Sequence, residues 1–587
     1  MKKYAVILFC IITCASLPAQ SVIDTWKISA DKIDPSNYYG ITVANGMIGI
    51  VSSPEPFKVK DVVLAGAYDL YGRGRVSNVL RSFNLLNMQI DIDGKRLGAG
   101  QTTNMKQVLD MKHASFTTSF DYGDKATISY TYYSLRQLPF TVLMDVTIAA
   151  KKDIALNSAS VMEAPDALKE VQNYYNEIDR PHVVISLLTS SAKSPTGKLL
   201  MCASNTFLFS EPHGQEPRVI HEMWDNNMHL MKFSKKIKAG EVYRFSIAGT
   251  SITSAHHEDP LNEAERMTIF AKLEGRERLI NFHNKAWDEL WKSDIQVEGD
   301  DQSQQDIHSM LYHLYSVVRE GTDLSPSPMG LSGLGYNGHV FWDTELWMYP
   351  SILVLHPEMA KSLVEYRYQR LAAAKKNAFN HGYKGAMFPW ESAASGVEET
   401  PVWALSGPFE HHITACVGIA AWNYYCVTQD KEWLKEKGWP VLKETADFWA
   451  SRVERNGPGK YDIKNVVAAD EWAENVDNNA WTNAAAKAVL QNATEAAKLL
   501  GVFADPDWLH VANNIPILKM DNGVTREHAA YNGEGIKQAD VNLLAYPLQE
   551  VSNPEQIRKE LTYCQTRVPN QGIPPVPAAI LSYVRHT

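Results

Sequence analysis

Two short segments of the sequence place a tryptophan directly before a carboxylate, which is a pairing that suits the binding of a sugar. One segment contains Trp342 and Asp343, and the other contains Trp390 and Glu391. A tryptophan ring can cover the apolar CH face of a sugar while the neighbouring carboxylate accepts hydrogen bonds from hydroxyl groups. A structural interpretation stays open for both segments, because Asp343 could cap a helix and either tryptophan could fill a core.

A third segment, residues 470–483, carries four carboxylates and four amides around the start of an alanine-rich stretch. A glycosidase needs one carboxyl group that stays protonated, so that it can deliver a proton to the leaving oxygen. Glu471 fits this need best, because it lies between a second carboxylate and a tryptophan, and such neighbours raise the pKa of a carboxyl. The alternative is an acidic loop that caps the next helix through Asp477 or Asn478.

Two further motifs give weaker signals. Lys537 and Gln538 lie side by side and could bind vicinal hydroxyl groups, although a solvated helix end gives the same pattern. Residues 410–412 (Glu-His-His) could suggest metal ligands, but adjacent histidines on a helix point in different directions and chelate poorly. The sequence contains no CxxC or HExxH motif. We therefore expect no metal and no cofactor.

The composition is that of an ordinary globular protein. The 587 residues are 45% hydrophobic and 21% charged, which argues against a largely disordered chain. The formal charge is −10, from 57 Lys and Arg against 67 Asp and Glu, and this argues against nucleic acid as the main partner. The 15 Trp and 26 Tyr suit a carbohydrate-binding protein, although most of these rings must fill core.

The N-terminus has the pattern of a secretory signal peptide, which we place at residues 1–20. Lys2 and Lys3 precede an almost entirely apolar run that is too short to span a bilayer. The mature protein is therefore expected to be soluble and to be periplasmic or secreted. A buried first helix is one alternative. A lipoprotein attached through Cys14 is disfavoured, because Thr13 is larger than the residue preferred before a lipidated cysteine.

The elements that must position these residues change in type along the chain. Residues 22–257 predict many short strands separated by turns, which favours a β-sandwich. Residues 258–300 are charged and helical in pattern and are expected to form a linker. In residues 301–587 the apolar positions recur with a helical period, and the number of helices suggests a toroid of paired helices. Long helices are predicted at residues 409–427 and 482–500.

Three motifs in this order resemble those of glycoside hydrolase family 65. They are residues 341–345 (Phe-Trp-Asp-Thr-Glu), 470–479 and 537–540 (Lys-Gln-Ala-Asp), and the resemblance covers most of the chain. The family includes maltose, trehalose and kojibiose phosphorylases, acid trehalases, and hydrolases of kojibiose or glucosylgalactosyl-hydroxylysine. The resemblance implies a multidomain protein with an N-terminal β-supersandwich, a helical linker and an (α/α)6 barrel that holds the active site. A homodimer is a further expectation from the family.

The resemblance also implies roles for individual residues. Glu471 matches the general acid of the family. Seven other positions match residues that line or bind the sugar: Trp342, Asp343, Trp390, Glu391, His412, Lys537 and Gln538. The implied mechanism is direct displacement with inversion, in which a base on the opposite face of the sugar ring activates water.

Hydrolysis is favoured over phosphorolysis by two arguments. The phosphorylases that resemble this chain carry Gln at the position of Glu391, and an extra carboxylate would repel the phosphate dianion. An exported phosphorylase would also release its sugar phosphate outside the cytoplasm. The sequence therefore predicts an exported inverting α-glucosidase, with a kojibiose-like α-1,2 linkage favoured. The alternative is a family 65 disaccharide phosphorylase that uses inorganic phosphate.

The C-terminal sequence departs from the family pattern. In the hydrolases the base is a Glu in the barrel segment that follows the Lys-Gln pair, but residues 572–587 are proline-rich and lose that pattern. We expect the last barrel helices to be missing through a truncation or frameshift near residue 572. None of Glu391, Glu534 or Asp540 can be assigned as the base from sequence. A catalytically impaired sugar-binding protein is therefore a second alternative.

Overall fold

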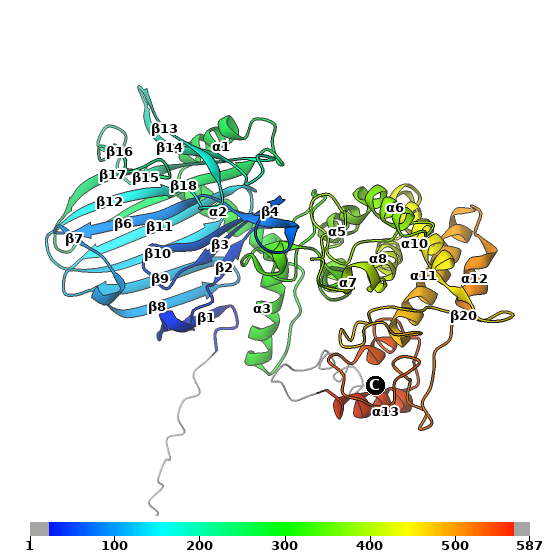
Figure 1. Ribbon diagram of the computed structural model, residues 1–587. Coiled ribbons are helices and arrows are strands. Elements are labelled where there is room, and N and C mark those ends of the chain that lie inside the picture. The colour runs from blue at the N-terminus through cyan, green and yellow to red at the C-terminus, as the bar shows by residue number, and fades with distance from the viewer. Residues whose placement is uncertain (1–22, 569–587) are drawn as a thin grey trace, which may run out of the picture.

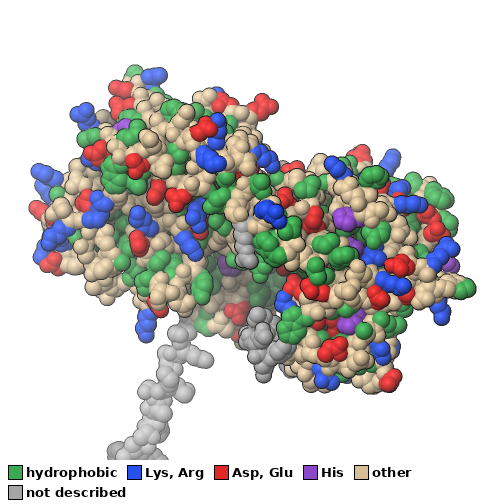
Figure 2. All heavy atoms as spheres, viewed as in Figure 1, with side chains coloured by type: hydrophobic (Ala, Val, Ile, Leu, Met, Phe, Trp, Pro, Cys, Tyr) green, Lys and Arg blue, Asp and Glu red, His purple; other side chains and the backbone are tan. Residues whose placement is uncertain are grey.

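The computed structural model describes residues 23–568. The predicted signal peptide at residues 1–20 and the proline-rich segment at 572–587 lie outside this range. Figure 1 shows a β-sheet region at one end of the molecule and a helical region at the other. Within the described range, no helix is both long enough and apolar enough to cross a membrane. Figure 2 shows acidic and basic side chains interspersed over the visible face, without the basic stripe that a nucleic acid would need.

Two large antiparallel sheets form most of the N-terminal region. The first has nine strands in the order β1 (Lys27–Ala30), β8 (Thr102–Asp110), β9 (Ser115–Tyr122), β10 (Ala126–Ser134), β11 (Thr141–Ala150), β18 (Val242–Thr253), β15 (Leu200–Phe209), β14 (Val183–Lys193) and β13 (Lys169–Arg180). The second has five strands in the order β16 (Ile220–Met223), β17 (Met228–Ile237), β12 (Ile154–Glu163), β6 (Asn84–Ile92) and β7 (Lys95–Arg96).

The two sheets pack face to face, as the predicted sandwich requires. Alternate residues of β10 are buried, among them Ile128 and Tyr130, because successive side chains of a strand point to opposite faces. Gly249 of β18 faces Leu85 of β6 so closely that a Cβ there would lie 2.5 Å from the leucine Cδ1. The Asn205 side chain of β15 donates to the Leu85 carbonyl at 2.7 Å, which satisfies a polar group inside the sandwich.

A smaller four-stranded sheet lies where the β-sheet region meets the helical region. Its strands run in the order β2 (Thr42–Ala44), β3 (Ile48–Ser52), β4 (Val59–Leu70) and β5 (Ser77–Arg81). The N–H of Gly46 donates to the Ser316 carbonyl at 2.7 Å, which joins the β2–β3 turn to the first helix of the helical region. This sheet is therefore in direct contact with the helical region.

The charged segment after the sandwich forms two helices, α1 (Pro260–Glu274) and α2 (Arg276–Leu290), separated by Gly275. α1 packs on β15 and β18, and the Thr268 hydroxyl donates to the Ser204 carbonyl of β15 at 3.1 Å. Arg276 binds Asp145 of β11 through two contacts of 2.6 Å each. The predicted linker is therefore held against the sandwich along its length.

The helical region contains nine main helices within the described range. They are α3 (Asp301–Val317), α4 (Tyr349–Leu355), α5 (Pro357–Gln369), α6 (Leu371–Asn380), α8 (His412–Thr428), α10 (Trp439–Arg452), α11 (Ala480–Leu500), α12 (Pro506–Ala512) and α13 (Pro554–Gln565). The helices predicted at residues 409–427 and 482–500 are confirmed as α8 and α11.

Helix α8 lies at the centre of this region. Twelve of its 17 residues are buried, which is the pattern of a helix that is covered on all sides. It packs against α5, α10 and α11. At Gly418 a Cβ would lie 3.0 Å from both the Thr445 hydroxyl of α10 and a methyl group of Val489 of α11. The absence of a side chain there allows three helices to approach closely.

The two helix-capping alternatives that the sequence left open are wrong. α11 is capped by Asn479, whose side-chain oxygen accepts from the Thr482 N–H at 2.9 Å. Asp477 and Asn478 accept backbone N–H groups from an earlier part of the same loop, so their side chains fix the loop itself. Asp343 precedes the π-helix at Thr344–Met348 and makes no capping hydrogen bond. The Asp343 carboxylate therefore does not cap a helix.

One buried arginine joins the sandwich to the helical region. Arg136 follows β10, and its Nη1 donates to the carbonyl oxygens of Asn45, Tyr315 and Val318 at 3.0, 2.9 and 3.1 Å. Burial lowers the pKa of its guanidinium to about 9, since the charged form is desolvated. The charge is offset by three carbonyl dipoles, and the end of α3 is thereby fixed against the β2–β3 turn.

We expect the Arg136→Met substitution to lower the free energy of unfolding by at least about 3 kcal/mol, because three buried carbonyl oxygens lose a charged donor. Urea unfolding followed by tryptophan fluorescence measures the change. Arg96→Met is the matched control, because Arg96 pairs with Asp91 at an exposed site, where a pair contributes less than about 1 kcal/mol. Equal losses in the two variants would contradict the role given to Arg136.

Candidate active site

Three tryptophan rings meet around a single histidine at the start of α8. The ring centroid of His412 lies 4.7 Å from that of Trp342, 5.3 Å from that of Trp390 and 6.0 Å from that of Trp481. All three contacts are edge-on, which is a favourable geometry for aromatic rings. Trp390 and Trp481 are buried and Trp342 is partly exposed, so Trp342 presents the accessible face of the cluster.

The histidine at the centre of these rings is neutral. His412 is fully buried, and burial lowers the pKa of its imidazole to about 3. Its Nε2 lies 3.1 Å from Oε1 of Glu410. Burial also raises the pKa of the Glu410 carboxyl well above its usual value, and the charge of Glu471 adds to that shift. A protonated Glu410 can therefore donate to the neutral ring.

Asp343 lies in the same electrostatic environment. Burial raises the pKa of its carboxyl to about 6, and the nearby charges of Glu345 and Glu471 add to the shift. Glu345 is itself held by Arg367 of α5 through two contacts of 2.6 and 3.1 Å between buried groups. This bidentate pair fixes the π-helix directly after Asp343, and interruptions of this kind are frequent at functional sites.

The predicted acid and the predicted hydroxyl-binding lysine are in direct contact. Nζ of Lys537 forms an ion pair with the Glu471 carboxylate, and both side chains are partly exposed. The nearest charge to Glu471 is therefore a cation, in place of the crowded like charges that the sequence suggested. Trp472 is 54% exposed and takes no part in the tryptophan cluster.

A buried carboxylate joins the two loops that carry these residues. Oδ1 of Asp470 accepts the backbone N–H of Trp472 at 3.2 Å, and those of Lys537 and Gln538 at 3.0 and 3.4 Å. Asp470 is only 2% exposed, so these bonds are shielded from water. The position of Glu471 relative to Lys537 and Gln538 therefore depends on its neighbour Asp470.

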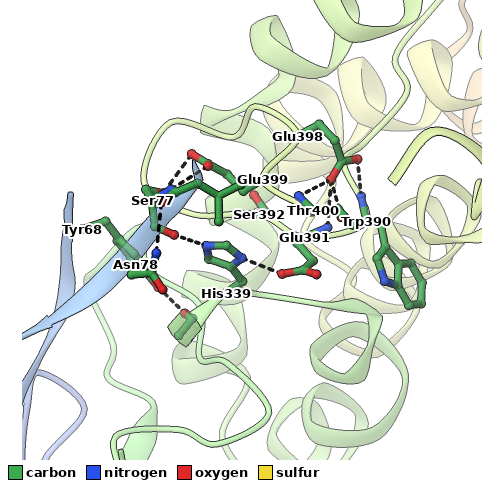
Figure 3. A network of polar contacts seen from close by, with 12 residues as sticks. Tyr68, Ser77, Asn78, His339, Trp390, Glu391, Ser392, Glu398, Glu399 and Thr400 are labelled. Carbon is green, nitrogen blue, oxygen red and sulfur yellow. Dashed lines mark hydrogen bonds and ion pairs between the residues drawn. The ribbon is translucent and has the colours of Figure 1, made fainter. Parts of the chain in front are cut away.

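Trp390 and Glu391 are fixed by the carboxylate of Glu398 and by a contact between Glu391 and His339, both of which Figure 3 shows. The carboxylate of Glu398 accepts the backbone N–H groups of Trp390 and Glu391 at 2.8 and 3.3 Å. The side chain of Glu391 points to His339, whose Nδ1 lies 2.7 Å from its Oε2. Glu391 is thus partnered within the protein.

Most of the residues predicted for the site lie together, and the structure adds others. Trp342, Trp390 and His412 share one ring cluster, and Glu471 is paired with Lys537. Trp481, Glu410 and Asp470 were not among the predicted sugar-site residues, although all three lie within or beside the segments selected from the sequence. Their contacts are with residues that are distant in the sequence, so these contacts can be seen only in the folded structure.

Two of the three carboxyls that could not be assigned as the base from sequence, Asp540 and Glu534, have different surroundings. Asp540 is buried, accepts from the Asn479 side chain at 2.7 Å, and has its pKa raised to about 7 by burial. Glu534 is exposed, and its hydrogen bonds to backbone N–H groups outweigh its partial burial and lower its pKa. Neither environment by itself marks the group as a base that activates water.

The side chains of His411 and His412 have different hydrogen-bond partners. The side chain of His411 turns away from His412, with its Nε2 2.8 Å from the Pro408 carbonyl and its Nδ1 accepting from Arg452 at 3.1 Å. Within residues 23–568, no group of three or more His, Cys, Asp or Glu side chains is arranged to hold a metal ion.

Models of two domains of one enzyme family match the chain. The model of the glycosyl hydrolase family 65 N-terminal domain matches residues 40–290, and that of the family 65 central catalytic domain matches residues 308–528. A kojibiose hydrolase from Mucilaginibacter mallensis is 68% identical over 569 residues, which cover 97% of this chain and 84% of that protein. A kojibiose hydrolase from Flavobacterium johnsoniae is 58% identical over 584 residues, which cover 99% of this chain and 86% of that protein.

One solved structure, described as "Putative kojibiose phosphorylase from human microbiome", superposes with a TM-score of 0.79. The alignment covers 93% of this chain and 81% of that chain at 16% sequence identity. At this identity the likeness concerns the fold alone, which combines a β-sheet-rich N-terminal domain with a helical domain.

We expect the Asp470→Ala substitution to lower the free energy of unfolding by about 2–4 kcal/mol, because buried N–H groups of two loops lose their acceptor. The peptide bond after Lys537 should also become more sensitive to trypsin, since its loop is released. Thermal unfolding and the rate of cleavage at this bond measure both effects. Asp477→Ala is the control, because Asp477 accepts a single exposed N–H. Unchanged cleavage after Lys537 would contradict the clamping role of Asp470.

Proposed function

The chain belongs to glycosyl hydrolase family 65, and from this premise we infer that it hydrolyses kojibiose, a disaccharide of two α-1,2-linked glucose units. The observation that carries this conclusion is the similarity to kojibiose hydrolases over 97% and 99% of the chain. The family and the α-1,2 hydrolysis that the motifs predicted are both confirmed by that similarity. The enzyme is therefore a glycoside hydrolase whose substrate is a small carbohydrate.

We propose Glu471 as the general acid. Its carboxyl group would donate a proton to the glycosidic oxygen while water attacks the anomeric carbon from the opposite face of the ring, with inversion. Two features support this role. Glu471 is exposed to solvent, and its charge contributes to the raised pKa of Asp343, so the two carboxyls lie near each other.

The other residues of the site are proposed to hold the non-reducing glucose. The exposed face of Trp342 would cover the CH face of the sugar, and the carboxylate of Asp343 would accept its hydroxyl hydrogen bonds. Lys537 and Gln538 would bind further hydroxyl groups, which the Asp470 clamp supports by fixing their backbone. A site held by short backbone contacts keeps reacting groups in the geometry that the reaction needs.

The finer description of the fold is also a proposal. The arrangement of α5, α10 and α11 around the buried helix α8 supports an (α/α)6 barrel, and the face-to-face sheets support a supersandwich. Export of the enzyme stays a prediction from residues 1–20.

The general base stays unassigned. An inverting enzyme needs a second carboxylate about 6.5–9.5 Å from the acid. We assign this role to none of the described carboxylates.

The structure changes one reason for preferring hydrolysis. The sequence argument treated the Glu391 carboxylate as a free charge that repels phosphate. His339 contacts this carboxylate at 2.7 Å, so its charge is at least partly offset within the protein. The preference for water therefore rests on the similarity to hydrolases, and the sequence argument from charge repulsion is not supported.

We expect the purified chain to release free glucose from kojibiose in phosphate-free buffer, and faster than from trehalose, maltose or nigerose. Glu471→Gln should lower kcat by a factor of about 10²–10⁴, because the proton donor is removed. Glucose release measured with a coupled oxidase assay gives both results. Glu474→Gln, an exposed carboxyl in the same loop, is the matched control and should keep near-normal activity. Strict dependence on phosphate, or full activity of Glu471→Gln, would contradict the proposal.

The pH dependence should show the titration of Asp343. Its pKa is raised to about 6, so the carboxylate that accepts sugar hydroxyls is present above pH 6 and is lost as the pH falls through this value. We therefore expect kcat/KM for kojibiose to fall about tenfold per pH unit below about pH 6. In Asp343→Asn this limb should disappear while overall activity falls. The same limb persisting in Asp343→Asn would show that another group titrates.

A further inference from the structure

Both ring nitrogens of His339 face oxygen atoms that accept hydrogen bonds. Nδ1 lies 2.7 Å from Oε2 of Glu391, and Nε2 lies 2.6 Å from the backbone carbonyl oxygen of Ser77 (Figure 3). A neutral imidazole carries only one N–H, so two such contacts require a second proton on the pair. The His339 side chain is fully buried. The histidine and Glu391 therefore share a proton, and the carboxylate charge is offset.

The Ser77 end of this contact is itself fixed. Ser77 begins β5 in the N-terminal region, and its backbone N–H and its hydroxyl both donate to the carboxylate of Glu399 at 2.9 Å. The Tyr68 hydroxyl of β4 donates to the Gly338 carbonyl at 2.5 Å. Gly338 has φ +71°, and a Cβ there would lie 2.4 Å from a methyl group of Val79, so only glycine allows this close approach.

Glu391 directly follows Trp390, whose ring packs in the tryptophan cluster of the candidate active site. Residues Val340 and Ser392 form a two-bond antiparallel bridge, with N–H to carbonyl distances of 2.8 and 3.0 Å. His339 and Glu391 therefore lie next to this bridge, in the two segments that carry Trp342 and Trp390. His339 engages Oε2 of Glu391, which leaves Oε1 for a sugar hydroxyl.

We propose that His339 is a positioning residue for the hydrolysis, which holds Glu391 in place for sugar binding and takes its own position from Ser77 of the N-terminal region. This inference rests on the proposed function, because it assumes that Glu391 lines the kojibiose pocket. It makes the N-terminal region part of the substrate-binding machinery, through a single chain of contacts from β5 to His339 to Glu391.

A double-mutant cycle tests the proposal. His339→Gln, Glu391→Gln and the double variant are compared for kcat and KM with kojibiose. The dissociation constant for kojibiose is measured for the same set in the Glu471→Gln background, where turnover is suppressed. We expect each single substitution to raise KM and the dissociation constant about 10- to 100-fold, with a smaller change in kcat. The double variant should be no weaker than the worse single variant, because His339 acts through Glu391.

A matched control separates positioning from a merely structural role. His356 is also buried between a carboxylate and a carbonyl, with Nδ1 3.0 Å from Glu358 and Nε2 3.0 Å from the Leu290 carbonyl, but it lies outside the site. We expect His356→Gln to lower thermal stability without changing KM. Ser77→Ala, which removes one bond to Glu399, is a milder variant and should raise KM by a factor of about two to five.

The outcomes distinguish this inference from the proposed function. Additive effects in the cycle, or an unchanged KM in His339→Gln, would overturn the positioning role while hydrolysis stands. A chain that binds kojibiose without hydrolysing it would overturn the proposed function, while the binding cycle still decides the role of His339. A chain that neither binds nor hydrolyses kojibiose would overturn both.

Discussion

The candidate active site depends on the packing of three tryptophan rings against one neutral imidazole. Trp342, Trp390 and Trp481 come from segments far apart in the sequence, and all three meet His412 at the first residue of α8. Burial lowers the pKa of His412 to about 3, so no unpaired charge has to be accommodated among the rings. Because α8 is itself enclosed by other helices, its position sets the geometry of the proposed sugar-binding surface.

Three carboxyl groups beside these rings differ in their surroundings. Glu410 is enclosed, and burial raises the pKa of its carboxyl well above its usual value. Asp343 is partly covered and has its pKa raised to about 6, while Glu471 is exposed and in contact with the Lys537 ammonium group. One chemical group thus occupies three different environments close to these rings.

The sequence predicted those features that depend on local patterns. Helices α8 and α11 follow from apolar period and alanine content, and the tryptophan–carboxylate pairs follow from residue type. The features it did not predict depend on distant contacts, such as the bond between Ser77 and His339 across 262 positions. The cap of α11 was missed because neighbouring polar residues compete for one N–H, and only the loop geometry selects Asn479.

The contact between His339 and Glu391 also bears on how the enzyme chooses water over phosphate. A carboxylate that shares a proton with a buried histidine exerts little repulsion on a dianion, so its charge cannot by itself exclude phosphate. In the proposed inverting mechanism the nucleophile attacks from the face of the sugar opposite Glu471, and discrimination would then depend on the groups that surround that face. In our proposal, Glu391 contributes its remaining acceptor oxygen, which would bind and orient the sugar. The choice between water and phosphate is separate from this binding role, so a substitution at Glu391 should change affinity for the disaccharide without creating a phosphorylase.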